Sequence, residues 1–226
     1  MTDKPTAQSG FTLIELMIVV SIIAVIAGVA IPNLLSSRAM ANDRAILSTL
    51  RTIATAQAQC RQGAHVDLDG DGQAEALTLQ ELAGSATLRG SASALRPPML
   101  SASLGDIDAD GHLNKHGYLL ALFLPDASGT GLAATAANLA SIDPDLSESY
   151  WSCVAWPADR VSKVGATYFV NQIGEILMCK NSGYMGKTAV PPAGAALIGV
   201  AASQVSTSQL AAGVVGADGH VWMPVQ

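Results

Sequence analysis

The stretch FTLIELMIVVSIIAVIAGVAI, residues 11–31, decides the fold of this 226-residue chain. It is a run of 21 residues in which Glu15 is the only charged side chain. At about 1.5 Å of rise per residue, a helix of this length spans roughly 30 Å, the thickness of the hydrocarbon core of a membrane. The segment therefore predicts a membrane-spanning helix close to the amino terminus.

The ten residues before this run, MTDKPTAQSG, are polar and contain one lysine. A secretory signal peptide has a shorter apolar stretch, followed by a cleavage site of small residues. In this chain Gly10 stands before the apolar run, and no A-x-A site follows it. On hydropathy alone, the simplest interpretation is a signal anchor that tethers the rest of the chain to a membrane.

Glu15 is not explained by an anchor, because a carboxylate within a membrane helix is costly unless it finds a partner. If the chain were cut after Gly10, the new α-amino group of Phe11 would lie near the depth of Glu15 on a parallel neighbouring helix shifted by about one turn. An ammonium and a carboxylate attract strongly in a medium of low dielectric constant. We therefore expect Phe11 and Glu15 to fix the axial register between subunits of a filament.

The string GFTLIEL at residues 10–16, continued by MIVVSIIAVIAGVAIP, closely resembles the amino terminus of type IV pilins and type II secretion pseudopilins. The resemblance covers roughly residues 1–60. It implies that residues 1–10 are a leader peptide, which a prepilin peptidase removes by cleavage after Gly10, and that Phe11 is N-methylated. It also implies that Glu15 acts in assembly and that the helix breaks near Pro32.

This resemblance implies a structural subunit, with no enzymatic activity, that forms a homo-oligomeric helical filament with the help of an inner-membrane assembly machinery. The subunit would sit in the bacterial inner membrane before assembly and in a periplasmic or extracellular filament afterwards. Two alternatives stay open: a pseudopilin of a type II secretion system, and a monomeric calcium-binding ectodomain tethered by residues 11–32. The net charge of −6 argues against a nucleic-acid partner.

Beyond residues 11–32, the sequence predicts that the helix continues over residues 33–62 as an amphipathic segment. Its apolar face is marked by residues at spacings of three and four: Ile46, Leu50, Ile53, Gln57 and Cys60. Pro32 lacks an amide hydrogen, so we expect a kink or local melting there. Gly63 marks the predicted end of the helix.

The segment 67–75 carries carboxylates at alternate positions around two glycines. Calcium prefers several hard oxygen ligands, which Asp67, Asp69 and Asp71 can supply, with the backbone carbonyl of Gln73 and the side chain of Glu75. The twelfth loop position, where an EF-hand has a glutamate, is Thr78. The sequence leaves two interpretations open, a calcium loop or a solvated turn, and it indicates no required cofactor.

A second string, DIDADGH at residues 106–112, has the same aspartate spacing but runs directly into an apolar stretch. Gly117 occupies the position of its closing ligand. Here a turn is the favoured interpretation and calcium the alternative.

Residues 63–226 predict a globular domain of α+β class, in which the long helix packs on a small antiparallel sheet. The expected strands are residues 118–124 and 150–156, the hairpin of 166–171 with 175–179, and residues 220–225. Thr78 and Glu81 predict a short capped helix. The stretches near 127–141 and 190–216 are rich in small residues and predict loops that cover the surface.

The three cysteines leave two interpretations open for a domain that faces an oxidising compartment. Cys153 and Cys179 both fall in predicted strands, so this pair is the favoured disulfide, with Cys60 left over. The alternative is three buried free thiols. No catalytic sequence motif accompanies the four scattered histidines, which also favours a protein without enzymatic activity.

Overall fold

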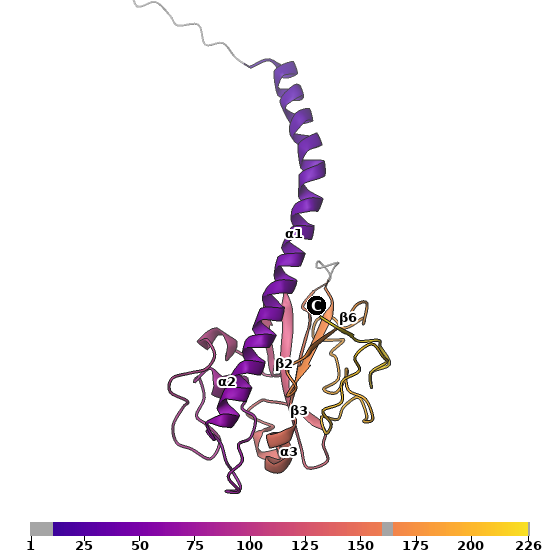
Figure 1. The fold of residues 1–226 in the computed structure, drawn as a ribbon. Helices are drawn as coiled ribbons and strands as arrows, with labels where there is room; N and C mark the ends of the chain where they lie inside the picture. The colour runs from indigo at the N-terminus through magenta and orange to yellow at the C-terminus, as the bar shows by residue number, and fades with distance from the viewer. Residues whose placement is uncertain (1–10, 160–164, 226) are drawn as a thin grey trace, which may run out of the picture.

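The computed structural model describes residues 11–159 and 165–225. One long helix, α1 (Leu13–Gln62), is followed by a domain that contains an antiparallel sheet and two short α-helices, α2 (Leu79–Leu82) and α3 (Pro144–Ser149). Figure 1 shows that the first half of α1 projects away from the domain, whereas its second half lies across the sheet. The structure is therefore α+β, as the sequence predicts.

The second half of α1 packs on the sheet through the predicted face. Ile46, Leu50, Ile53, Gln57 and Cys60 are all buried, and Ala56 lies among them. This face recurs every three or four residues, so a single stripe of the helix is removed from water. The helix ends at Gln62, as predicted, and the cap residue Gly63 donates its N–H to the Gln59 carbonyl.

The sheet has seven antiparallel strands in the order β1-β2-β4-β5-β6-β7, with β3 paired to the end of β2. The bounds are β1 (His112–Lys115), β2 (Tyr118–Pro125), β3 (Gly131–Ala133), β4 (Ser152–Pro157), β5 (Thr167–Asn171), β6 (Ile176–Cys179) and β7 (Met223–Pro224). All the predicted strands are present. The structure adds β1 and β3, which are too short and too mixed in composition to show a strand pattern in the sequence.

Both faces of the sheet are covered, and β2 shows this residue by residue. Leu120, Leu122 and Leu124 belong to the core cluster beneath α1. Leu119, Ala121 and Phe123 alternate with them and belong to a second cluster on the other face. Because successive side chains of a strand point to opposite faces, a strand that is buried on both sides is apolar throughout.

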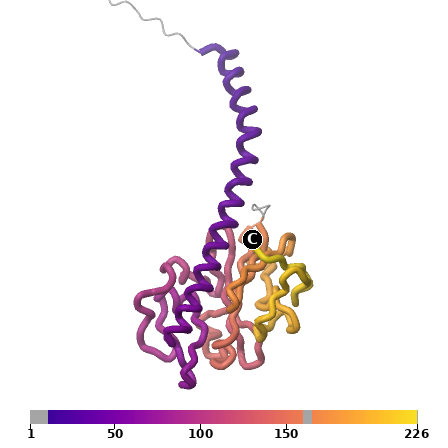
Figure 2. Tube along the Cα trace, in the orientation of Figure 1, coloured from indigo at the N-terminus to yellow at the C-terminus, as the bar shows by residue number. Residues whose placement is uncertain are grey.

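The second face is covered by residues 190–216, and here the prediction of surface loops is only half right. The segment is irregular, but several of its side chains are buried against the sheet together with Trp222: Ala193, Ala195, Ala196, Leu197, Val205 and Ala211. A Cβ atom at Gly194 would lie 2.1 Å from the Gln204 carbonyl oxygen, so glycine permits this close packing. In Figure 2 the yellow carboxyl-terminal trace lies across the sheet from α1.

A hydrogen bond from the Tyr118 hydroxyl to the Asp43 carboxylate joins β2 to α1 at the point where the helix reaches the sheet. We expect Tyr118→Phe to lower the free energy of unfolding by about 1–3 kcal/mol, because it leaves the half-buried carboxylate without this donor. Denaturant unfolding of the full-length protein in detergent, followed by tryptophan fluorescence, measures the change. Tyr150→Phe removes a hydroxyl from a half-buried ring and is the control. Equal stabilities of Tyr118→Phe and the wild type would contradict this role.

Candidate functional site

The amino terminus of α1 is organised by a capping box between Thr12 and Glu15. The Glu15 carboxylate accepts hydrogen bonds from the Thr12 N–H at 2.8 Å and the Thr12 hydroxyl at 2.6 Å. In return, the Thr12 hydroxyl oxygen accepts the Glu15 N–H at 3.3 Å. We did not predict this cap, although the pattern Thr-x-x-Glu was readable in the sequence. The cap fixes the carboxylate at the first turn of the helix.

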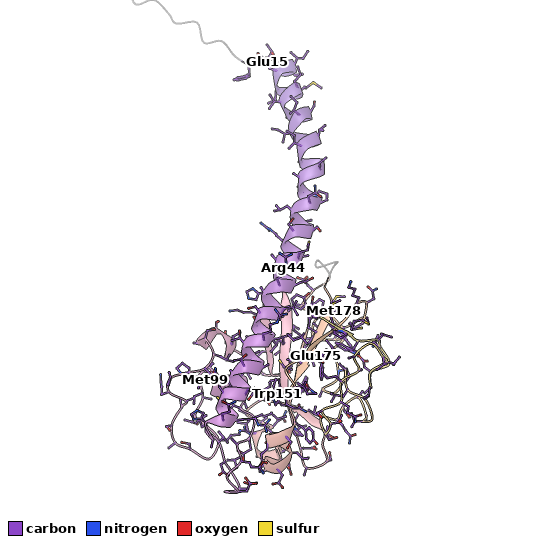
Figure 3. The ribbon with its side chains drawn as sticks, viewed as in Figure 1. Glu15, Arg44, Met99, Trp151, Glu175 and Met178 are labelled. Atoms are coloured by element: carbon purple, nitrogen blue, oxygen red, sulfur yellow. The ribbon has the colours of Figure 1, made fainter. Side chains whose placement is uncertain are left out.

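Figure 3 shows Glu15 at the end of α1 that lies far from Trp151 and Met178 in the domain. Phe11 next to it is 91% exposed. Gly10, the other residue of the predicted cleavage site, lies outside the described residues, as does the rest of the predicted leader. The structure thus places Phe11 and Glu15 at the tip of the helix, while Pro32, the third residue expected to act in assembly, lies inside α1.

The first half of α1 is apolar on all sides, and the rest of the described chain leaves it exposed. An 18-residue window of the helix has a mean hydropathy of 2.8, and none of it is buried. Even Val19, one of its best covered large side chains, is 51% exposed. A helix that is hydrophobic all round is stable only in lipid or against other apolar helices. This half of the helix is therefore the part of the chain that requires a partner.

The prediction of a helix break near Pro32 is wrong for the structure, because α1 runs without interruption from Leu13 to Gln62. Figure 1 shows a gentle curve along this helix. A proline inside a helix removes a single backbone donor, here the one that would serve the Gly28 carbonyl. The hydrogen bonds on both sides of Pro32 suffice to continue the helix.

The aspartate loop is the second candidate site. Carboxylate oxygens of Asp67, Asp69 and Asp71 lie within 4.8 Å of one another. Asp67 holds the turn, since it accepts the N–H groups of Gly70 at 2.7 Å and Gly72 at 3.1 Å. Both glycines have a positive φ, which favours glycine. The structure therefore brings the three predicted aspartates together.

The other two predicted ligands, Gln73 and Glu75, help to shape the loop. Gln73 donates its backbone N–H and its side-chain amide to Asp71, at 2.7 and 3.1 Å. Glu75 is fully buried, and its Oε1 accepts the Leu68 N–H at 2.7 Å. The Glu75 N–H also closes the neck of the loop by donating to the Val66 carbonyl at 3.1 Å. Whether the two residues bind a cation stays a prediction.

Helix α3, which we did not predict, lies against this loop. The Asp143 side chain caps it by accepting the Leu146 N–H at 2.9 Å, and Pro144 opens its first turn. This Asp-Pro pair is a helix-start signal that was readable in the sequence. The Ala76 N–H donates to the Ser147 carbonyl at 2.9 Å and so joins the end of the loop segment to α3.

Two carboxylates of α3 meet the loop. Oxygens of Asp69, Asp145 and Glu148 lie within 4.8 Å of one another. A hydrogen bond with Asp69 and the negative charge of Asp69 raise the pKa of Asp145. Burial, followed by the charges of Asp71 and Asp69, raises the pKa of Glu148. The negative charges of this cluster therefore repel one another.

Two carboxylates of the second aspartate loop are paired with a lysine. Lys187 forms ion pairs with Asp108 and Asp110, and the Asp108 carboxylate also accepts the His112 N–H at 2.8 Å. Burial would raise the pKa of Asp108, but these hydrogen bonds outweigh it and lower the pKa. The segment is a turn that leads into β1, which agrees with the favoured interpretation.

The predicted disulfide between Cys153 and Cys179 is wrong for this structure, in which all three cysteines are free and buried. Cys153 lies in β4 and Cys179 in β6, and β5 separates these two strands. Moreover, Cys153 packs in the cluster beneath α1, whereas Cys179 packs on the opposite face. The alternative of three buried thiols is confirmed. Burial, together with the charge of Glu81, raises the pKa of Cys60 to about 11.

Comparison with known proteins yields a match to the amino-terminal segment. Residues 5–31 match the prokaryotic N-terminal methylation motif. A stretch of 41 residues is 58% identical to the type IV wide pilus major component PilA4 of Thermus thermophilus, and it covers 18% of this chain and 31% of that protein. The chain thus spans about a third of the length of the curated relative that it matches. The search of solved structures gave no significant match.

The methylation motif and the pilin-like stretch lie where the structure shows a capped apolar helix that is exposed along its length. In this amino-terminal segment, the chain is similar to a type IV pilin.

Proposed function

We propose that the chain is a structural subunit of a type IV pilus-type filament and polymerises through the first half of α1. The observation that carries this proposal is the exposed apolar half-helix, of which no part of an 18-residue window is buried. In the membrane, lipid covers this surface, and in a filament the same surface is covered by equivalent helices. The family consists of structural subunits rather than enzymes.

The register between subunits would come from charge. The capping box holds the Glu15 carboxylate at the first turn, so its position along the helix axis is fixed. Cleavage after Gly10 would give Phe11 a free amino group, which reaches the depth of Glu15 on a neighbour shifted by about one turn. Each charge then offsets the desolvation cost of the other. A subunit added in any other register would leave both charges unpaired.

Processing would precede assembly. A prepilin peptidase of the inner membrane would cleave after Gly10, and the new Phe11 amine would be methylated. A methylated amine keeps its positive charge at neutral pH, so the modification preserves the pairing with Glu15. The matched relative is a pilus major component, which favours a pilus over a secretion pseudopilus.

Amino-terminal sequencing and intact-mass measurement of purified filaments test this processing. We expect the assembled chain to begin at Phe11 and to be heavier than the cleaved sequence by one methyl group. The unprocessed precursor from the membrane fraction is the control. Assembled subunits that still begin at Met1 would contradict the proposal.

A further inference from the structure

The aspartate loop has no carboxylate at its twelfth position, where a calcium loop of this type has its closing ligand. Its twelfth position is Thr78, and the Thr78 hydroxyl accepts the Glu81 N–H at 3.1 Å as the cap of α2. A bidentate carboxylate normally closes a loop of this type. A complete cation site at Asp69 and Asp71 therefore needs a carboxylate from elsewhere in the chain.

Glu148 of α3 lies where such a carboxylate is needed. Its side chain is buried, at 5% exposure. Carboxylate oxygens of Glu148, Asp69 and Asp145 lie within 4.8 Å of one another. Among residues 11–159 and 165–225, no hydrogen-bond donor reaches its buried Oε1. A buried carboxylate oxygen without a partner is costly, because it has lost its hydration and gained nothing in return. The same holds for Oε2 of Glu75, whose charge also acts on Glu148.

No basic side chain offsets this charge in the described part of the chain. The ion pairs found there involve neither the aspartates of the loop nor the carboxylates of α3. The second aspartate loop shows the contrast, since Lys187 pairs with both Asp108 and Asp110. Of these two loops with the same aspartate spacing, the second is paired with a lysine and the first has no ion pair among the described residues.

We propose that the first loop and α3 together bind one calcium ion, held by Asp69 and Asp71 of the loop and by Asp145 and Glu148 of the helix. Glu148, about 70 residues after Thr78 in the sequence, supplies the carboxylate that the twelfth loop position lacks. Calcium suits the site because it accepts six to eight oxygen ligands in irregular geometry, whereas magnesium requires a near-ideal octahedron. Asp67 holds the turn, as its hydrogen bonds to Gly70 and Gly72 show.

Such an ion would tie the segment after α1 to α3, which are otherwise joined here by the hydrogen bond from Ala76 to Ser147. A cation that binds the folded state stabilises it by mass action. The proposal is independent of filament formation, because all four ligands lie in the same subunit.

The test is isothermal titration calorimetry of EDTA-treated, full-length protein in detergent micelles, with calcium chloride and magnesium chloride as separate titrants. We expect one calcium per chain and a rise in the thermal midpoint with calcium. Glu148→Gln and Asp145→Asn should each weaken calcium binding by about tenfold or more, because each removes a charged ligand. Asp145 is exposed, so its variant keeps the test valid if Glu148→Gln does not fold.

Asp110→Asn is the matched control, since Asp110 occupies in the second loop the position of Asp71 in the first. Its calcium affinity should equal that of the wild type. The proposal is overturned if calcium gives neither heat nor a change in the thermal midpoint, or if magnesium binds as tightly as calcium. It is also overturned if both α3 variants bind calcium as the wild type does, or if Asp110→Asn weakens binding as much as they do.

Discussion

Replacement of Glu15 by glutamine is expected to abolish filament assembly while the protein still inserts into the membrane. Glutamine retains the oxygen that accepts the Thr12 N–H, so the capping box and the start of α1 survive. The substitution removes only the negative charge, which leaves the Phe11 amine of the neighbouring subunit unpaired in an apolar surrounding. Sheared surface filaments and membrane-bound subunits, both measured by immunoblot, give the two readouts.

Glu175→Gln is the control for this experiment, because Glu175 is an exposed glutamate on the turn between β5 and β6, far from Glu15 (Figure 3). It should assemble like the wild type. A normal filament yield from Glu15→Gln would show that the charge does not set the register. Loss of the protein from the membrane would instead assign Glu15 a role in insertion, which also contradicts the proposal.

The second large effect is expected at Leu50, the fully buried side chain in the middle of the α1 face that packs on the sheet. Leu50→Ala should lower the free energy of unfolding of the domain by about 2–5 kcal/mol, because it removes buried methyl groups and leaves a cavity. Denaturant unfolding in detergent measures this through the fluorescence of the buried tryptophans, Trp151, Trp156 and Trp222.

Leu34→Ala supplies a matched control on the same helix, since Leu34 is 53% exposed and lies before the domain. The same atoms are removed there from a surface that the domain does not cover, so the stability of the domain should not change. Equal losses at the two positions would mean that helix propensity, rather than packing on the sheet, determines the effect.

Local patterns in the sequence predicted the elements that have a strong period. The spacing of Ile46, Leu50 and Ile53 identified the buried face of α1 because a long helix repeats its stripe many times. The apolar run of β2 identified a strand because both of its faces are covered. Helix α3 was not predicted, because six residues are too few to show the helical period of apolar residues, although Asp143 and Pro144 marked its start.

Other features depend on contacts between distant segments, which local spacing does not encode. Cys153 and Cys179 both lie in strands as predicted, but the strand order and the alternation of side chains place them on opposite faces. Residues 190–216 are buried where their small side chains pack on the face of the sheet that α1 does not cover. Glu148 meets Asp69 only because α3 folds back against the loop.

A cryo-electron microscopy reconstruction of the native filament measures the contact on which the assembly proposal rests. The density should place a carboxylate oxygen of Glu15 within about 4 Å of the Phe11 nitrogen of an adjacent subunit, the range of an ion pair. A filament in which Glu15 faces only apolar side chains, out of reach of every amino terminus, would contradict it.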